Sequence, residues 1–330
     1  PMQYGTIVHY ILERFFGEYT KEEYLSLEED KFQKIVCAYL AEYAVKYFGE
    51  EQLESNSFTY RLKTILDNVM YLMKHIMEEL SQSEFFVADC ELKIGEDIPS
   101  YTIVLPDGHK IAVCGSVDRV DIMQRADITY LRIIDYKTGT KQFKLSDILY
   151  GINLQMLLYL HSIEASGGDK YGEIVPAGIL YMPATVPYIS SDSLKSIDKL
   201  PDELNKKLKM NGLLLKDTEI IHGMDKTDVA TYIPVKIKAG EPVSSTSLAT
   251  LAEFGKIFKK VDMLIAEMGK NIYNGNIEAK PLKGGHDSCE YCPYDSVCAY
   301  RQSNPITCFS VDNKTVIEEI TNEINGKEEE

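Results

Sequence analysis

Acidic residues and one lysine follow two neighbouring apolar stretches of this sequence. Asp118 and Asp121 come at the end of the first stretch, and Asp135 and Lys137 come at the end of the second. Residues i and i+2 of a strand point to one side, so Asp135 and Lys137 share a face, and a neighbouring strand can bring Asp118 within reach. Carboxylate oxygens are the ligands that Mg²⁺ prefers, and a cation held in this way activates a water molecule. The pattern therefore predicts a divalent-cation site, although Asp-x-Lys alone is also typical of a surface salt bridge.

Two predicted helices add polar side chains that are four residues apart. Gly5 and His9 form the first pair, and Gln155 and Tyr159 form the second. Because residues i and i+4 lie on one helix face, each pair projects in one direction. Taken alone, His9 is more typical of a surface or core histidine than of a metal ligand.

Three cysteines, Cys289, Cys292 and Cys298, have the spacing Cys-x2-Cys-x5-Cys. Thiolates at such a spacing hold zinc or an iron–sulfur cluster, and either group requires a fourth ligand. Cys308 and His286 are candidates for that ligand. The total of seven cysteines is odd, so a disulfide framework is not expected. Three others lie in apolar patterns and are expected in the core: Cys37, Cys90 and Cys114.

Hydrophobic periodicity predicts an α/β fold that begins with long helices. Apolar residues repeat at helical spacing in three early segments: 3–16, 20–55 and 58–82. From residue 85 onward β-branched and aromatic residues predict strands in an antiparallel meander, with a turn at 106–109: 85–92, 101–105, 110–122 and 130–136. A helix over 145–163 followed by a strand over 173–182 is a βαβ step, which predicts a mixed central sheet with helices packed on it.

The same pattern divides the chain into four segments. Residues 1–183 form the core, with the helices over 1–82 and the sheet and next helix over 85–183. Residues 184–245 combine polar stretches with a short apolar run at 212–215 and a strand over 231–237, and are interpreted as an accessory lobe. Residues 246–308 carry a long helix over 247–272 and the cysteines, and the acidic residues 309–330 are expected to be disordered. Because the chain begins at Pro1 with a helix directly after it, we expect a piece of a longer protein.

The net charge of −16 argues against a wholly basic nucleic-acid-binding surface. The acidic excess is concentrated in three stretches: 18–30, 50–54 and 318–330. Lysines cluster elsewhere and suit either a local basic groove or a solvated face: Lys137, Lys141 and Lys144, and then Lys206, Lys207 and Lys209. No apolar run reaches the ~18–20 residues that span a bilayer, and no signal-peptide pattern is present, so a cytoplasmic location is expected.

Together these motifs resemble the RecB-type branch of the PD-(D/E)xK nucleases. The similarity rests on Gly5-x3-His9, Gly115-x2-Asp118-Arg119-x-Asp121, Ile134-Asp135-Tyr136-Lys137-Thr138-Gly139 and Gln155-x3-Tyr159. Within that branch the chain is most similar to the C-terminal nuclease domain of AddB (RexB-like) helicase–exonuclease subunits. The similarity covers nearly the whole chain and includes Gly178–Tyr181, Gly212–Leu215, Tyr232–Val235 and the cysteines.

The resemblance implies a restriction-endonuclease-like core and an Mg²⁺-dependent (or Mn²⁺-dependent) DNA exonuclease. It implies action on one strand of a broken duplex end, in double-strand-break repair by homologous recombination, together with an AddA-type helicase–nuclease subunit. By the same resemblance, the metal ligands are His9, Asp118 and Asp135, the catalytic lysine is Lys137, and the residues that support the site and the DNA backbone are Gln155 and Tyr159. Asp121 stays open, and Glu91 fits either a related acid of the family or a solvated strand position.

In the family resembled, Cys289, Cys292 and Cys298 are ligands of a [4Fe–4S] cluster. The fourth cysteine of that family lies upstream of the Gly-x3-His helix, and this sequence begins at Pro1. We therefore expect the chain as given to lack an intact cluster, with residues 284–300 held loosely against the first helix.

Two alternatives stay open at this point. One is a CRISPR-associated or organellar iron–sulfur exonuclease of single-stranded DNA. The other is a catalytically inactive nuclease fold that serves as a DNA-binding or docking module. Asp118, Asp135 and Lys137 argue against the inactive module, because close carboxylates without a cation destabilise a fold.

Overall fold

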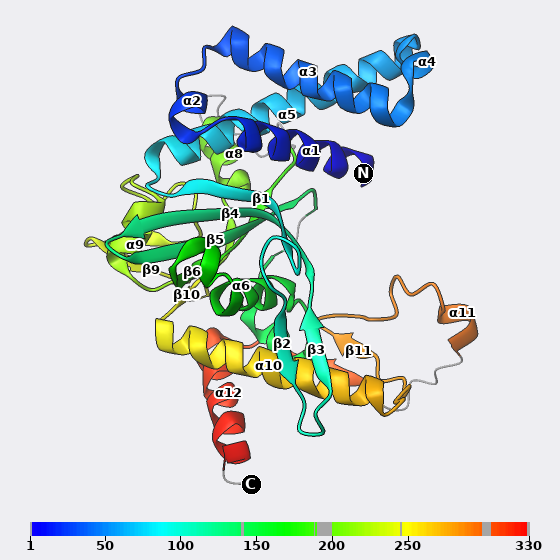
Figure 1. Ribbon diagram of the computed structural model, residues 1–330, viewed down its shortest axis with the longest axis vertical. Coiled ribbons are helices and arrows are strands. Elements are labelled where there is room, and N and C mark those ends of the chain that lie inside the picture. Colours follow the sequence, from blue (N-terminus) through cyan, green and yellow to red (C-terminus); the bar gives the residue numbers. More distant parts are fainter. Residues whose placement is uncertain are drawn as a thin grey trace.

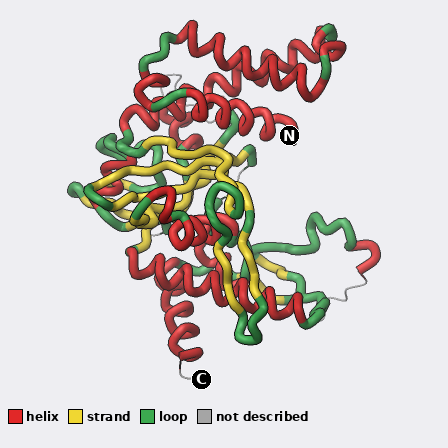
Figure 2. The backbone as a smooth tube through the Cα atoms, viewed as in Figure 1, coloured by secondary structure: helices red, strands yellow, loops and turns green. Residues whose placement is uncertain are grey.

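A six-stranded mixed sheet forms the centre of the molecule, and its strand order is β1-β4-β5-β6-β7-β10 (Figures 1 and 2). The computed structural model describes residues 2–139, 142–187, 189, 200–244, 246–298 and 305–328. The six strands are β1 (Phe86–Ile94), β4 (Gly115–Arg125), β5 (Ile128–Lys137), β6 (Glu173–Pro183), β7 (Asn211–Leu215) and β10 (Leu248–Ala249). The pairs β5–β6 and β7–β10 are parallel, and the other neighbours are antiparallel. The predicted mixed α/β sheet with its βαβ step is confirmed.

Helices from the start of the chain form a layer beside β1 and β4 (Figure 1). They are α1 (Met2–Glu18), α2 (Lys21–Leu25), α3 (Glu29–Phe48), α4 (Glu50–Leu53) and α5 (Asn56–Gln82). Helix α1 buries an apolar stripe at helical spacing: Ile7, Val8, Ile11, Leu12 and Phe15. The helix predicted over 20–55 is three helices, since Ser26 caps α2 and Gly49, with a φ of 80°, ends α3. Among the described helices, none combines the length and apolar character needed to cross a bilayer.

Later helices pack on the sheet and below it. They are η1 (Leu145–Tyr150), α6 (Gln155–Ser166), α7 (Gly168–Tyr171), α8 (Leu200–Leu208), α9 (Thr218–Met224), α10 (Leu251–Tyr273), α11 (Asp295–Cys298) and α12 (Asn313–Glu328). The prediction of a single helix over 145–163 is wrong for its first half. A 3₁₀ turn ends at Gly151, whose φ of 68° is left-handed, and α6 begins only at Gln155.

The strand predicted over 110–122 is two strands in two different sheets. Strand β3 (Lys110–Val113) pairs with β2 (Tyr101–Val104) in a separate hairpin, which packs against α10. The predicted turn at 106–109 joins the two, and Gly108 takes a φ of 86° there. Because the chain leaves this hairpin at Cys114, β1 pairs directly with β4, so the predicted meander is wrong.

Part of the segment 184–245 belongs to the central sheet rather than to an accessory lobe. Strand β7 pairs with β6 over Tyr181↔Asn211 to Gly178↔Leu214. A Cβ at Gly212 would lie 2.0 Å from the carbonyl oxygen of Ile179, so only glycine allows this close pairing. The strand expected over 231–237 is instead β8 (Lys236–Lys238), which pairs with β9 (Glu241–Val243).

The acidic tail is a packed helix, so the expectation of disorder over 309–330 is wrong for its described part. Helix α12 places Val316, Ile320 and Ile324 four residues apart, and all three are buried. It packs against α10, where Lys260 Nζ lies 2.5 Å from Glu323 Oε2. Glu318 and Glu319 are exposed on the solvent face, as in any amphipathic helix.

Candidate metal centre and active site

Three elements far apart in the sequence bring His9, Glu91 and Asp118 together. Helix α1 supplies the histidine, β1 the glutamate and β4 the aspartate, and one ligand atom of each lies within 4.8 Å of the others. His9 Nδ1 is 3.0 Å from Glu91 Oε1, and His9 Nε2 is 3.7 Å from Asp118 Oδ2. Within the described part of the chain, no other three His, Cys, Asp or Glu side chains gather this closely.

Strand β5 places Asp135 and Lys137 next to this group. The β4–β5 ladder ends at Arg119↔Ile134, and continuing its register by one residue puts Asp118 opposite Asp135. The backbone N–H of Tyr136 donates a hydrogen bond of 2.9 Å to Asp118 Oδ2. Asp135 is buried, and its Oδ2 lies 2.5 Å from Lys137 Nζ. The fold thus brings two carboxylates and the lysine to one end of the β4–β5 pair.

The carboxyl groups of this site lie close together, and their proximity changes the pKa values of its residues. Burial, together with the nearby charges of Asp135 and Glu91, raises the pKa of Asp118 to about 6, against the opposing effects of His9 and a backbone hydrogen bond. The hydrogen bond to Glu91 raises the pKa of His9 above its ordinary value in spite of burial. A carboxyl that is destabilised as an anion among like charges is relieved by a bound cation. These residues therefore suit a divalent-cation site.

Glu91 occupies a strained position on β1, and the sequence left its role open. Its φ is 51°, in the left-handed region that non-glycine residues seldom adopt. The β1–β4 ladder passes from Cys90↔Arg119 to Leu92↔Val117 without a pair at Glu91. Its carboxylate accepts hydrogen bonds from Ser116 Oγ at 2.9 Å and from His9. Strain held by such contacts is typical of functional sites.

Helix α6 places Tyr159 against the start of β4. A Cβ at Gly115 would lie 2.1 Å from Tyr159 Oη, so glycine leaves the space that the tyrosine occupies. Gln155 is exposed at the first position of α6. In the described chain the hydrogen bonds to the His9–Glu91–Asp118 group come from Ser116 and Tyr136, and none comes from Gln155 or Tyr159.

Asp121 lies on the other side of β4 from Asp118, because an odd spacing reverses the side chain of a strand residue. It belongs to a fully buried ionic cluster with Glu79, Arg119 and Arg132. Arg119 Nε donates to Asp121 Oδ1 at 2.6 Å, and Arg132 Nη2 donates to Glu79 Oε1 at 2.6 Å. Burial would raise the pKa of Asp121, but the two guanidinium groups outweigh it and hold the pKa below its ordinary value. The cluster ties α5 to β4 and β5 behind the metal group.

The predicted cysteine ligands lie on the segment that projects past the end of α10, where Cys298 is the last residue of α11 (Figure 1). Cys289 and Cys292 are half-buried and Cys298 is exposed, and no three cysteine sulfurs in the described chain come within 4.8 Å of one another. Cys308 is buried in β12 (Ile306–Cys308), beside β11 (Leu282–Gly284), and His286 is exposed. Cys114 is exposed, so its predicted core position is wrong.

Comparisons with known proteins agree with this geometry. The model of the PD-(D/E)XK nuclease superfamily matches residues 1–299. The B subunit of the ATP-dependent helicase/deoxyribonuclease of Thermoanaerobacter sp. (strain X514) is 34% identical over 312 residues, 91% of this chain and 27% of its own length. The protein of the same description from Alkaliphilus oremlandii (strain OhILAs) is 32% identical over 336 residues, which cover 97% of this chain and 29% of that protein. The B subunit from Clostridium kluyveri (strain NBRC 12016) is 36% identical over 281 residues, which cover 82% of this chain and 24% of that protein. The chain spans about a quarter of the length of these relatives.

Proposed function

Because the chain belongs to the PD-(D/E)XK nuclease superfamily, we propose that it hydrolyses phosphodiester bonds of DNA with the help of Mg²⁺ or Mn²⁺. The observation that carries this proposal is the gathering of His9, Glu91 and Asp118 beside the Asp135–Lys137 pair. Carboxylate oxygens with one imidazole suit these cations. His9, Asp118 and Asp135 would hold the ion.

Each side chain then has a distinct task. When bound, the cation neutralises charge on the scissile phosphate and lowers the pKa of a bound water. Glu91 accepts a hydrogen bond from His9 Nδ1, which leaves the Nε2 lone pair directed towards Asp118. Lys137 places its ammonium 2.5 Å from Asp135 Oδ2, where it can stabilise the negative charge that develops on the phosphate oxygens.

The test is cleavage of end-labelled DNA with and without Mg²⁺. Asp135→Asn and Lys137→Ala should each lose 100-fold or more of the rate, in the range of about 10²–10³ for loss of one stabilising group. Asp127→Asn, which removes an exposed carboxylate from the β4–β5 turn, is the matched control and should keep full activity. Undiminished cleavage by Asp135→Asn contradicts the proposal. Calorimetric titration with Mg²⁺ separates an inactive fold, which binds no ion at this group, from an enzyme.

We further propose that the enzyme is an exonuclease of the AddB type, acting on one strand of a broken duplex in recombinational repair with a helicase partner. Support comes from the relatives described as the B subunit of an ATP-dependent helicase/deoxyribonuclease. Linear single strands should then be degraded while circular single strands survive. Cleavage of circles at the same rate contradicts exonuclease action. Co-elution with an AddA-type subunit in size-exclusion chromatography tests the partnership.

A further inference from the structure

A groove of about 590 Å³ opens directly beyond the catalytic end of β5. Its walls include Thr138, Gly139 and Gln142 from the loop after β5, and Lys206 and Lys207 from α8. Thr138, Gly139 and Gln142 are exposed, and a Cβ at Gly139 would meet no atom within 4 Å. The groove is therefore open to solvent just past the end of β5.

The sheet topology joins this groove to the active site. The parallel strands β5 and β6 end at the same edge, with Lys137 paired to Pro183, and ligands bind outside such carboxyl ends. One row across the sheet runs from Asp135 through Tyr181 to Asn211, the first residue of β7. Three neighbouring strands span two strand spacings, about 10 Å. The groove thus begins within one row of the catalytic carboxylate.

Side chains of Asn211 and Lys209 hold the groove in shape. Asn211 Oδ1 accepts a hydrogen bond of 2.7 Å from the backbone N–H of Phe143, which ties the loop after β5 to β7. Lys209 Nζ donates to the carbonyl oxygens of Ala230 and Val235, at 2.6 and 3.1 Å. Lys209, which lines the groove, is thus fixed in place by two backbone carbonyls.

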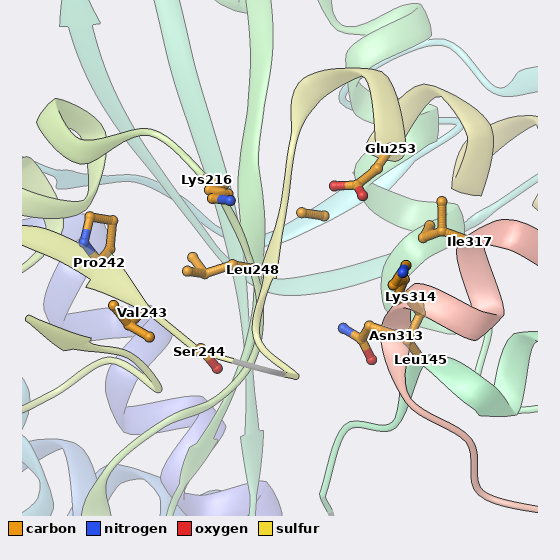
Figure 3. A pocket seen from close by; sticks show the side chains of 11 residues that line it. Leu145, Lys216, Pro242, Val243, Ser244, Leu248, Glu253, Asn313, Lys314 and Ile317 are labelled. Carbon is orange, nitrogen blue, oxygen red and sulfur yellow. The ribbon is translucent and has the colours of Figure 1, made fainter.

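The charge of this groove is opposite in sign to that of the whole chain. The described residues that line it include lysines and no aspartate or glutamate, in a chain of net charge −16. The other described pockets contain both lysines and carboxylates in their lining. In the pocket of Figure 3, Lys216 and Lys314 share the lining with Glu253. The pockets beside α2 and between α2 and α5 likewise contain glutamates. Lys206 has Glu203 as an ion-pair partner, so the positive excess of the described lining comes from the three lysines together, and such an excess favours an anionic ligand.

Helix α8 presents two of these cations to solvent. Lys206 and Lys207 are exposed in its last turn, and Lys206 Nζ lies 2.7 Å from Glu203 Oε1. Lysines in a last turn also complement the helix dipole. That effect explains their place on α8, but it does not explain why the rest of the described lining carries no carboxylate.

We propose that this groove binds the phosphodiester backbone of the DNA strand next to the scissile phosphate. The inference rests on the proposed nuclease function. Lys206 and Lys207 attract the backbone phosphates, and Thr138 and Gln142 supply hydrogen-bonding groups along the path. A strand that enters along α8 reaches Asp135 at the end of β5.

The test is a double substitution, Lys206→Gln with Lys207→Gln, against a matched control, Lys216→Gln with Lys314→Gln. Both pairs are exposed and remove the same charge, and the control pair lines the pocket of Figure 3. Binding of a fluorescent single-stranded 20-mer is measured by anisotropy in a Lys137→Ala background, which suppresses cleavage. The groove pair should weaken binding at least fivefold, and the control pair less than twofold. The slope of log K against log[salt] should become shallower by about 0.7 for each phosphate that the variant no longer neutralises.

A second measurement follows cleavage of the 20-mer with Lys137 in place. The groove pair should raise KM at least fivefold and leave kcat within a factor of two. Equal losses for the two pairs, or no loss for the groove pair, overturn the proposal. If the wild-type chain cleaves no DNA, the nuclease function fails, while the anisotropy result still decides whether the groove binds the strand.

Discussion

Replacing Gly115 with alanine tests how α6 and β4 are fitted together. The new Cβ would lie 2.1 Å from Tyr159 Oη and 2.5 Å from Tyr159 Cζ, closer than carbon and oxygen atoms can approach. Tyr159 must therefore move, and such overpacking costs about 1–3 kcal/mol. The backbone conformation at this position suits alanine, because Gly115 is not among the glycines with positive φ. In a strand without this clash, alanine is favoured over glycine by about 0.5–1 kcal/mol.

The sign of the change in unfolding free energy caused by Gly115→Ala should thus depend on Tyr159. Gly115→Ala should destabilise the wild-type chain by about 1–3 kcal/mol, yet stabilise a Tyr159→Ala chain by up to about 1 kcal/mol. Urea unfolding followed by circular dichroism measures both, since the sequence has no tryptophan for fluorescence. A coupling free energy near zero in this double-mutant cycle would refute the steric argument. DNA cleavage by Gly115→Ala should fall to the level of Tyr159→Ala, because both remove the tyrosine from its place.

Three further changes test other parts of the fold. Asp121→Asn leaves two buried guanidinium groups with Glu79 as the one remaining carboxylate of the cluster and should cost about 3–5 kcal/mol in urea unfolding, and a loss under 1 kcal/mol speaks against a tight cluster. Ile320→Ala should cost about 2–5 kcal/mol because α12 is packed, whereas Glu319→Ala on its exposed face should be nearly neutral, and equal small effects mean a frayed tail. Burial opposes the charge of His161, but hydrogen bonds to Asp262 and Glu164 outweigh it and raise the pKa of His161 to about 9. Since the folded pKa exceeds the unfolded value of about 6.5, this stabilisation is complete below pH 6.5 and is lost as the pH rises through 9. The stability difference between wild type and His161→Asn should shrink over that range, and a constant difference contradicts the ion pair.

Local patterns predicted most of the elements that carry the site. The stripe from Ile7 to Phe15 repeats at helical spacing, and the stretch before Asp135 has the β-branched residues of a buried strand, so both elements form as expected. The predictions failed where a tertiary contact decides between local options. Cys114 separates two strands because the β2–β3 hairpin packs on α10, and β7 is a core strand because Gly178 and Gly212 admit close pairing. The apolar stripe of Val316, Ile320 and Ile324 is visible in the sequence, but the acidic residues around it led to the wrong prediction of disorder.

For the site itself, local sequence is enough to specify the residue types and their strand and helix positions: His9, Asp118, Asp135, Lys137, Gln155 and Tyr159. Spacing alone establishes which side chains of one element share a face. The packing of the whole chain was needed to show that Glu91 joins His9, that Asp121 is part of a buried ionic cluster, and that Lys206 and Lys207 line the groove beyond β5. These outcomes depend on strand register and on the packing of α1 and α8 against the sheet. A shift of one residue in that register reverses every side chain of a strand, and the register of β1 against β4 joins segments that are far apart in the sequence.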